Sequence, residues 1–362
     1  MFDGVLEERR RAAADEKQRT QFAFFGCLPM EAAECHKEAI HDASVLQPRP
    51  SRPSDFVKVR LNDPNAYSDI SDWEFDFRQI GAGPLDARIS ARMGQAVTIM
   101  DAFFSPDFHQ VGTAPPEDIT LMLMVTPTMK TWRGIELDKP CLLSFGPEQE
   151  FEGVNTPGSR AINLSVPKQR LFDLADCFGL DVPQDALRSA PVWVTHNPWR
   201  LKALIQRASF FLTPPATCMT PADEKYLMMT LLLAVNDAQE QDDRSSLRIR
   251  SRAVARALDY MEDCADEPIS ISRICAETGV SWRTLDRAFL ERFGIGPKAY
   301  QTRLRLSRAR SDIMKQGPDC LVSDVANKWG FWHLGKFAQD YKALFGELPS
   351  ETRRRRSFFI SG

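Results

Sequence analysis

Hydrophobic and polar positions follow two different periods along this chain. Between about residues 55 and 170, short β-favouring runs such as VKVRL, EFDFRQI, ARISARM and ITLMLMV are separated by Gly, Pro, Asn and Asp. Such spacing predicts a β-sandwich or barrel. After Pro167 the apolar residues recur at helical spacing, as in PWRLKALIQRASFFL and ADEKYLMMTLLLAVNDAQEQ. The pattern therefore predicts a strand-rich half followed by a helical half.

Changes in composition divide the chain into four predicted segments. Residues 1–20 read as a charged N-terminal segment, and residues 21–235 hold the strands and the first helices. The polar run NDAQEQDDRSS marks a linker at about 236–247, and residues 248–362 are helical in pattern. Eight cysteines lack any zinc-ligand spacing, which is typical of buried thiols in a reducing compartment.

Charge is distributed unevenly between these segments. Residues 248–362 contain 21 Lys and Arg against 14 Asp and Glu, a net charge of +7, whereas the rest of the chain carries −10. A basic module joined to an acidic one indicates a nucleic-acid partner for the basic module. No run approaches the ~18 apolar residues of a membrane span, and FDGVLEERRRAAADEKQRT has charges where a secretory signal is apolar. We therefore expect a cytoplasmic protein with no membrane partner.

The basic module contains an internal duplication. The segment ICAETGVSWRTLDRAFLERFGIGPKAY is repeated as VANKWGFWHLGKFAQDYKALFGELPSET. Gly279 matches Gly330 at an offset of 51 residues and Phe293 matches Phe345 at 52, so the second copy has one extra residue in its turn. One supersecondary unit is thus present twice.

Each copy has the pattern of a helix-turn-helix motif, at about 270–293 and 321–345. Gly279 and Gly330 can take the left-handed conformation that ends a first helix, while Val280 and Phe331 fill the angle between helices. In the longer second helices, apolar residues recur at i, i+4 and i+8 and are expected to face the core: Leu285, Phe289 and Phe293 in one copy, and Phe337, Tyr341 and Phe345 in the other.

Side chains left on the leading turns are suitable for reading DNA bases. Arg pairs in bidentate fashion with guanine and Gln with adenine, and Leu can touch a thymine methyl. For a lone helix, solvated Arg287 and Gln339 side chains would be the simpler explanation. Two copies in a basic module favour DNA binding for the unit as a whole.

With these motifs in view, residues 248–362 resemble the DNA-binding module of AraC/XylS-type transcriptional regulators. The two helix-turn-helix units, the connecting helix YQTRLRLSRARSDIM and the closing FGELPSETRRR carry the resemblance, and GFWHLGKFAQDYKALF is similar to the branch containing ethanolamine-utilisation regulators. The resemblance implies that one protomer places two recognition helices in successive major-groove segments about one helical turn (~34 Å) apart. It implies base contacts from Arg283, Asp286, Arg287, Leu334, Gly335, Lys336 and Gln339. Many relatives carry Arg where this chain has Gln339, so the specificity of that half-site does not transfer.

Other residues of the module are candidates for phosphate contact, which gives salt-dependent affinity without sequence information. These are Trp282, Thr284, Arg303, His333 and Arg353. Arg305, Arg308 and Arg310 share the connecting helix with Arg303, and for Arg305 an internal ion pair is an equal alternative.

The strand-rich segment resembles, more weakly, the β-barrel sensor domains that precede this module in the family. The expected fold is therefore α+β and multidomain, with an N-terminal cupin-like barrel, a helical extension and a C-terminal all-α double helix-turn-helix. Such barrels hold a small effector between their sheets, and a small amine is the first class to test. Candidate pocket residues, for which plain core packing is the alternative, are Phe103, Phe104, His109, Trp132 and Phe145. We expect no metal and no cofactor.

The sequence thus predicts an effector-responsive transcriptional regulator, expected to be an activator and a homodimer, with operator DNA and RNA polymerase as partners. One alternative is a barrel enzyme with a DNA-binding appendage, which five histidines without clustered metal ligands disfavour. Another is a cyclic-dinucleotide-responsive regulator that uses Arg78, Arg88 and Arg92, although alternating solvent-facing strand residues explain these arginines equally well. A third is a regulator that needs no effector.

Overall fold

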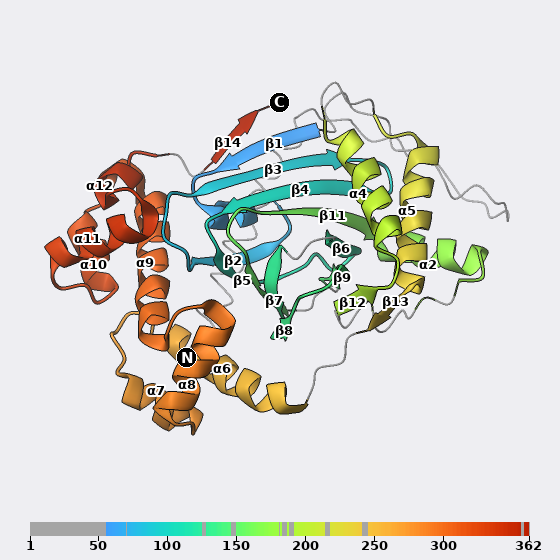
Figure 1. Ribbon diagram of the computed structural model, residues 1–362. Coiled ribbons are helices and arrows are strands. Elements are labelled where there is room, and N and C mark those ends of the chain that lie inside the picture. Colours follow the sequence, from blue (N-terminus) through green and yellow to red (C-terminus); the bar gives the residue numbers. More distant parts are fainter. Residues whose placement is uncertain are drawn as a thin grey trace, which may run out of the picture.

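The computed structural model describes residues 56–69, 71–124, 128–145, 150–180, 182, 187, 192–213, 218–240, 245–355 and 358–361 (Figure 1). The predicted charged segment at residues 1–20 lies outside these ranges. Strands dominate up to residue 167 and helices dominate afterwards, so the predicted order of strand-rich and helical parts is confirmed. We call residues 56–240 the strand-rich part and residues 245–355 the helical part.

The larger of two sheets has nine described strands, all paired antiparallel. Their spatial order is β13 (Ala238–Glu240), β12 (Val192–Thr195), β9 (Cys141–Ser144), β6 (Asp118–Met124), β11 (Ser159–Pro167), β4 (Thr98–Ser105), β3 (Asp86–Met93), β1 (Phe56–Leu61) and β14 (Phe358–Ser361). Strand β14 comes from the C-terminal end of the chain, so that end adds a strand to the sheet of the strand-rich part (Figure 1).

Both faces of the large sheet are covered around β6, which explains why this strand is apolar almost throughout. Leu121 and Leu123 pack in a cluster with three helices, α2 (Lys168–Cys177), α4 (Pro198–Phe211) and α5 (Pro221–Asn236). Met122 and Met124, on the opposite face of the same strand, pack in a second cluster with residues of the smaller sheet. The helices thus cover one face, as Figure 1 shows, and the smaller sheet covers the other.

The smaller sheet contains the described strands β2 (Glu74–Gln79), β5 (Phe108–Thr113), β10 (Glu150–Asn155), β7 (Met129–Trp132) and β8 (Ile135–Glu136) in that order. Within the described residues the two sheets each have their own edges, so of the predicted sandwich or barrel the structure has a sandwich of two packed antiparallel sheets. A sandwich and a barrel share the same inward and outward alternation, and only the pairing of edge strands distinguishes them.

The helical part contains seven described helices around two apolar clusters: α6 (Ser245–Asp263), α7 (Ile271–Thr278), α8 (Trp282–Phe293), α9 (Pro297–Gln316), α10 (Val322–Lys328), α11 (Leu334–Phe345) and α12 (Pro349–Thr352). One cluster holds Leu285, Phe289 and Phe293, and the other holds Phe337, Tyr341 and Phe345, which confirms the predicted core faces. Helix α9 contributes to both, through Tyr300 and Leu304 at one end and Ile313 at the other.

The segment 236–247, predicted to be a linker, includes residues of three described elements. Helix α5 ends at Asn236, strand β13 covers Ala238–Glu240, and helix α6 begins at Ser245. Across the described ranges, no helix combines the length and the apolarity that crossing a bilayer requires.

Candidate nucleic-acid interface

Both helix-turn-helix motifs turn at a left-handed glycine. Gly279 ends α7 with a φ of 68°, and Gly330 follows α10 with a φ of 69°. At Gly330 a Cβ atom would lie 2.8 Å from the carbonyl oxygen of Asp266 and 2.8 Å from Nη2 of Arg305, so both conformation and space require glycine. Helix α8 begins three residues after its glycine and α11 four residues after, which confirms the extra turn residue in the second copy.

The leading turn of α8 is exposed. Ser281 caps the helix by accepting a hydrogen bond from the Thr284 amide at 3.3 Å, and Trp282, Arg283 and Thr284 are all exposed. The Arg287 Nε donates to Oε1 of Glu291 at 2.8 Å, with the two side chains 73% and 46% exposed. A solvent-exposed pair of this kind contributes only about 0.3–0.5 kcal/mol, so the guanidinium can leave it for a base at little cost.

Helix α11 presents a matching edge, but without a side-chain cap. Its N-cap residue His333 makes no capping hydrogen bond, and a helix end of this kind offers its amide groups and positive dipole to an anion. Leu334, Gly335 and Gln339 are exposed, and Lys336 donates to Asp340 at 2.8 Å. The open N-terminus and these side chains therefore lie together on one surface.

Trp332 belongs to this edge although sequence reasoning did not include it among the contact residues. Its side chain is 68% exposed immediately before α11, whereas the neighbouring Phe331 packs against the apolar cluster. Aromatic periodicity placed Phe337, Tyr341 and Phe345 in the core and assigned no role to Trp332. The one-residue extension of the second turn is the signal that separates Trp332 from them.

The arginines of α9 are held by protein groups in the structure. Arg303 donates to the carbonyl oxygen of Ile80, and Arg305 donates to the carbonyl oxygen of Trp329 at 2.8 and 2.6 Å and lies over the Phe331 ring. Arg308 pairs with Asp76 and Glu262, and Arg310 with Glu347. Arg353, another candidate for phosphate contact, donates to the carbonyl oxygen of Cys320 at 3.3 Å. Arg303 or Arg353 would have to leave these acceptors to reach DNA.

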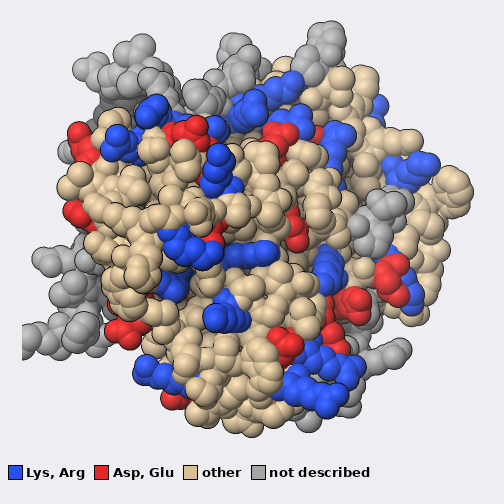
Figure 2. All heavy atoms as spheres, turned by 60° about the vertical axis from the view of Figure 1, so that its left-hand side comes forward, with Lys and Arg blue, Asp and Glu red and all other residues tan. Residues whose placement is uncertain are grey.

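Figure 2 turns the helical part toward the viewer. Lys and Arg groups are spread over this face with acidic groups between them. The view therefore shows a mixed surface, while the net charge of +7 on residues 248–362 is a property of their sequence. A net positive charge of this kind attracts a phosphate backbone.

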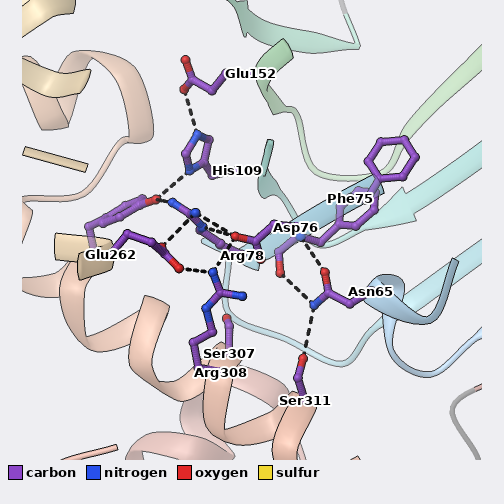
Figure 3. A network of polar contacts seen from close by, with 12 residues as sticks. Asn65, Phe75, Asp76, Arg78, His109, Glu152, Glu262, Ser307, Arg308 and Ser311 are labelled. Carbon is purple, nitrogen blue, oxygen red and sulfur yellow. Dashed lines mark hydrogen bonds and ion pairs between the residues drawn. The ribbon is translucent and has the colours of Figure 1, made fainter. Parts of the chain in front are cut away.

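The helical part is joined to the small sheet by a buried polar network (Figure 3). Tyr300 on α9 lies between His109 and Arg78: its Oη is 2.6 Å from Nδ1 of His109 and accepts a hydrogen bond from Nη1 of Arg78 at 3.2 Å. On the far side of the imidazole, Nε2 lies 2.8 Å from Oε1 of Glu152, and Glu152 also pairs with Arg292 of α8. The network therefore connects β2, β5 and β10 to two helices of the DNA-binding motif region.

The contacts assign the protons in this network. Burial raises the pKa of the Tyr300 hydroxyl, although Arg78 opposes the shift, so the hydroxyl keeps its proton and donates to Nδ1 of His109. Nε2 of the imidazole then carries the proton and donates to Glu152. Burial, reinforced by Arg78 and Arg292, holds the pKa of His109 well below its ordinary value, so the ring is neutral.

Arg78 stays charged at the centre of the interface. Burial alone would lower its pKa, but Tyr300, Asp76 and Glu262 together raise it above the ordinary value. Its Nη2 atom lies 2.7 Å from Asp76 and 2.9 Å from Glu262 of α6. Breaking one partner of such a buried pair typically costs about 3–5 kcal/mol, because the other charge is left without compensation.

A cavity of about 50 Å³ lies between the two sheets. Phe104 and Phe145, two of the predicted pocket residues, line it. The other three lie elsewhere: Phe103 packs under the Arg88 guanidinium, His109 lies in the interdomain network, and Trp132 is buried against Phe145 and Phe151. The cavity-lining residues that sequence reasoning missed include Phe75 and Phe77 of β2, which alternate along the strand with Asp76 and Arg78.

The three arginines considered for a cyclic dinucleotide have separate surroundings. Arg78 lies in the interdomain network, Arg88 pairs with Asp86 at 3.1 Å on the surface, and Arg92 is buried with its Nε donating to the carbonyl oxygen of Phe211. The structure therefore does not bring them together as an anion site. In the described part of the chain, no group of three His, Cys, Asp or Glu side chains is arranged to hold a metal.

Comparison with known proteins agrees with the helix-turn-helix geometry. A family model described as a helix-turn-helix domain matches residues 274–355. The probable thc operon regulatory protein of Rhodococcus erythropolis is 30% identical over 187 residues, which cover 50% of this chain and 54% of that protein. The XylDLEGF operon transcriptional activator 3 of Pseudomonas putida is 34% identical over 102 residues, 28% of this chain and 31% of the activator.

Among solved structures, that of a probable AraC family transcriptional regulator from Rhodopseudomonas palustris is 38% identical, over 28% of this chain and 97% of that one, with a TM-score of 0.27. The chain belongs to the AraC/XylS family. The match to the family model lies within the helical part, at residues 274–355. The chain spans about half or less of the length of the two curated relatives named above, at 54% and 31%. The finer likeness to the ethanolamine-utilisation branch stays a prediction.

Proposed function

We propose that this chain is a cytoplasmic, sequence-specific DNA-binding transcriptional regulator whose helices α8 and α11 enter adjacent major-groove segments. The observation that carries the proposal is the pair of equivalent, exposed leading turns on one basic module. Arg287 and Gln339 hold the same position in the two copies, 52 residues apart, and both are exposed. A bidentate Arg or Gln contact discriminates against a wrong base by about 1–3 kcal/mol.

The residues proposed for base contact are Arg283, Asp286 and Arg287 on α8, and Leu334, Gly335, Lys336 and Gln339 on α11. For phosphate contact we propose Trp282, Thr284 and His333, which lie on the same exposed edges, together with Arg303 and Arg353 after release from their present acceptors.

Selection of binding sites from a random DNA pool with the full chain tests this proposal. We expect one enriched site with two information-rich segments, and a binding constant that falls steeply with salt as phosphate contacts release counterions. Recovery of a pool with no enriched sequence would contradict sequence-specific recognition.

We propose that the strand-rich part is a sensor and dimerisation domain. Two observations support a sensor: the cavity between the sheets, and the strand β2, which lines the cavity with Phe75 and Phe77 and holds the helical part with Asp76 and Arg78. Figure 3 shows Phe75 pointing away from the network that Asp76 enters. A ligand that moved β2 would therefore act on the docking of α9.

For dimerisation, the supporting observation is aromatic exposure on the helical extension. Trp199 on α4 is 74% exposed and Tyr226 on α5 is 54% exposed. We propose that a second copy covers these helices, and that the dimer activates transcription together with RNA polymerase. Sedimentation equilibrium of the full chain and of Trp199→Ser tests the contact. We expect a dimer that the substitution weakens, and a monomeric wild-type chain would contradict it.

A further inference from the structure

We propose that the cavity between the two sheets binds a small, uncharged, single-ring molecule that donates one hydrogen bond to Asn163. The inference rests on the proposed function only in assigning a regulatory outcome to this binding. The chemistry of the ligand follows from the walls of the cavity.

Six of the residues that line the cavity are aromatic. The rings of Tyr67, Trp73, Phe75, Phe77, Phe104 and Phe145 line the cavity. Four of them form a continuous stack, with centroids 5.3 Å apart from Trp73 to Phe75, 4.9 Å from Phe75 to Phe77 and 5.2 Å from Phe77 to Phe104. An aromatic lining of this kind favours an apolar ligand over a polar one.

The lining offers one buried acceptor that its neighbours leave unused. Asn163 on β11 is 2% exposed and lines the cavity, and its Oδ1 has no hydrogen-bond partner. The nearby amide of Asn155 is already engaged, since its Nδ2 donates to Ser159 at 2.7 Å and its Oδ1 accepts from the Phe108 amide at 2.5 Å. A ligand N–H or O–H group at Asn163 would therefore satisfy a group that is buried without compensation.

A charged ligand does not fit the same walls. The lining residues include no Asp, Glu, Lys, Arg or His among the residues that the structure describes. Burial raises the pKa of the Tyr67 hydroxyl to about 12, so this group is also neutral near pH 7. An ammonium or carboxylate entering the cavity would lose its hydration without gaining a counter-charge. The small amine expected from the sequence is therefore replaced by an uncharged molecule.

Size sets the remaining requirement. The cavity measures about 50 Å³, whereas an engineered cavity of about 150 Å³ accepts benzene in another protein. Met100, Met122 and Met129 also line the space, and thioether side chains rearrange easily around a ligand. We expect these three side chains to move aside for a single ring and to exclude two fused rings.

The test compares four ligands of one ring size on the full chain by calorimetry and thermal melting. Benzyl alcohol is uncharged and has a donor, toluene lacks the donor, and benzylamine and benzoate are charged. We expect benzyl alcohol to bind about tenfold or more tightly than each of the other three. Equal or tighter binding of benzylamine or benzoate would overturn the inference, and so would a complete absence of binding.

Asn163→Leu separates the hydrogen bond from the shape of the cavity. In this variant we expect benzyl alcohol to lose about tenfold in affinity while toluene binds at least as well as before. Equal losses for both ligands would overturn the role of Asn163. The comparison of benzyl alcohol with toluene in the wild-type chain makes the same test if the variant does not fold.

Binding of the selected operator, measured with and without benzyl alcohol, distinguishes this inference from the proposed function. A changed operator affinity supports the regulatory outcome. Sequence-specific DNA binding that does not change when benzyl alcohol binds would leave the DNA-binding function intact and overturn the regulatory outcome.

Discussion

Two exposed basic side chains on the leading turns can exchange a carboxylate partner for a DNA base. Arg287 is paired with Glu291 and Lys336 with Asp340, both along exposed helix faces where such pairs are weak. The pairs keep the long side chains extended along the helix in the absence of DNA. A base edge can replace the carboxylate at little cost, which is a favourable starting state for direct readout.

Arg287→Ala is expected to weaken binding to the selected site by about 1–3 kcal/mol and to relax the preference at one base pair. Fluorescence anisotropy on the selected site and on its single-base variants measures both effects. Lys342→Ala, an exposed charge on α11 outside the candidate set, is the matched control. Equal losses on selected and random DNA would show that Arg287 contacts a phosphate.

His109 makes stability depend on pH through its neutral ring. Its pKa is depressed in the folded chain from an ordinary value of 6.5. The unfolded chain therefore binds more protons below pH 6.5, and the free energy of unfolding falls as the pH is lowered, by up to about 1.4 kcal/mol per pH unit from this group. His109→Gln, which can keep a donor and an acceptor, should remove this part of the slope.

Chemical denaturation of both chains between pH 7.5 and 5 measures the difference. Other titrating groups are common to the two proteins, so their contributions cancel. Identical slopes for wild type and variant would contradict a neutral, buried His109.

At the scale of elements, the two recognition helices differ in how they begin. Helix α8 has the Ser281 cap, while α11 has no side-chain cap and carries Gly335 in its first turn, where a Cβ would meet no atom within 4 Å. This glycine serves neither a positive φ nor a close protein contact. We propose that it allows the backbone to approach DNA closely.

Gly335→Ala is therefore expected to raise the free energy of unfolding by about 0.5–1 kcal/mol, because alanine is the better helix former, while lowering affinity for the selected site. Gly330→Ala is the contrast, since the positive φ and the 2.8 Å contacts there should destabilise the fold. Thermal melting measures the stability of each variant, and fluorescence anisotropy measures its affinity for DNA. Unchanged DNA affinity in Gly335→Ala would contradict the proposal that the backbone at this position lies close to DNA.

Strand β2 offers a second test at this scale, because its two faces have different partners. In Arg78→Met, a cavity ligand should still bind but should no longer alter operator affinity, and the melting temperature should fall. Arg88→Met on β3 is the control, as this exposed arginine lies outside the network. If a cavity ligand altered operator affinity in Arg78→Met as much as in the wild-type chain, β2 would not be the connection between the cavity and the helical part.

Local patterns in the sequence predicted the helices and turns of the helical part. They did not predict contacts between residues far apart in the chain. The glycine turns and the stripes of Phe289 and Phe337 follow from periodicity and duplication, which act over a few residues. The contact of Arg78 with Tyr300 joins residues 222 positions apart, and no periodic signal marks it. For the same reason the sequence did not show that His109 contacts Tyr300 of the helical part, or that Arg303 donates to the carbonyl oxygen of Ile80 in the strand-rich part.

At the scale of the whole molecule, the helical part is docked on the small sheet and tied to the large one. The polar network, the pairing of β14 with β1 and the hydrogen bond from the Gly83 amide to the Leu344 carbonyl at 2.9 Å all connect the two parts. The orientation of α8 and α11 is thus fixed partly by the strand-rich part. An effector that changes the small sheet has a direct physical route to both recognition helices.

Hydroxyl-radical footprinting of the full chain on its selected site tests the central claim, that one chain reads DNA with two helices. The account predicts two protected segments about one helical turn apart on the same face of the duplex, with Arg287→Ala weakening one segment and Gln339→Ala the other. A single protected segment, or one that both substitutions weaken equally, would contradict it.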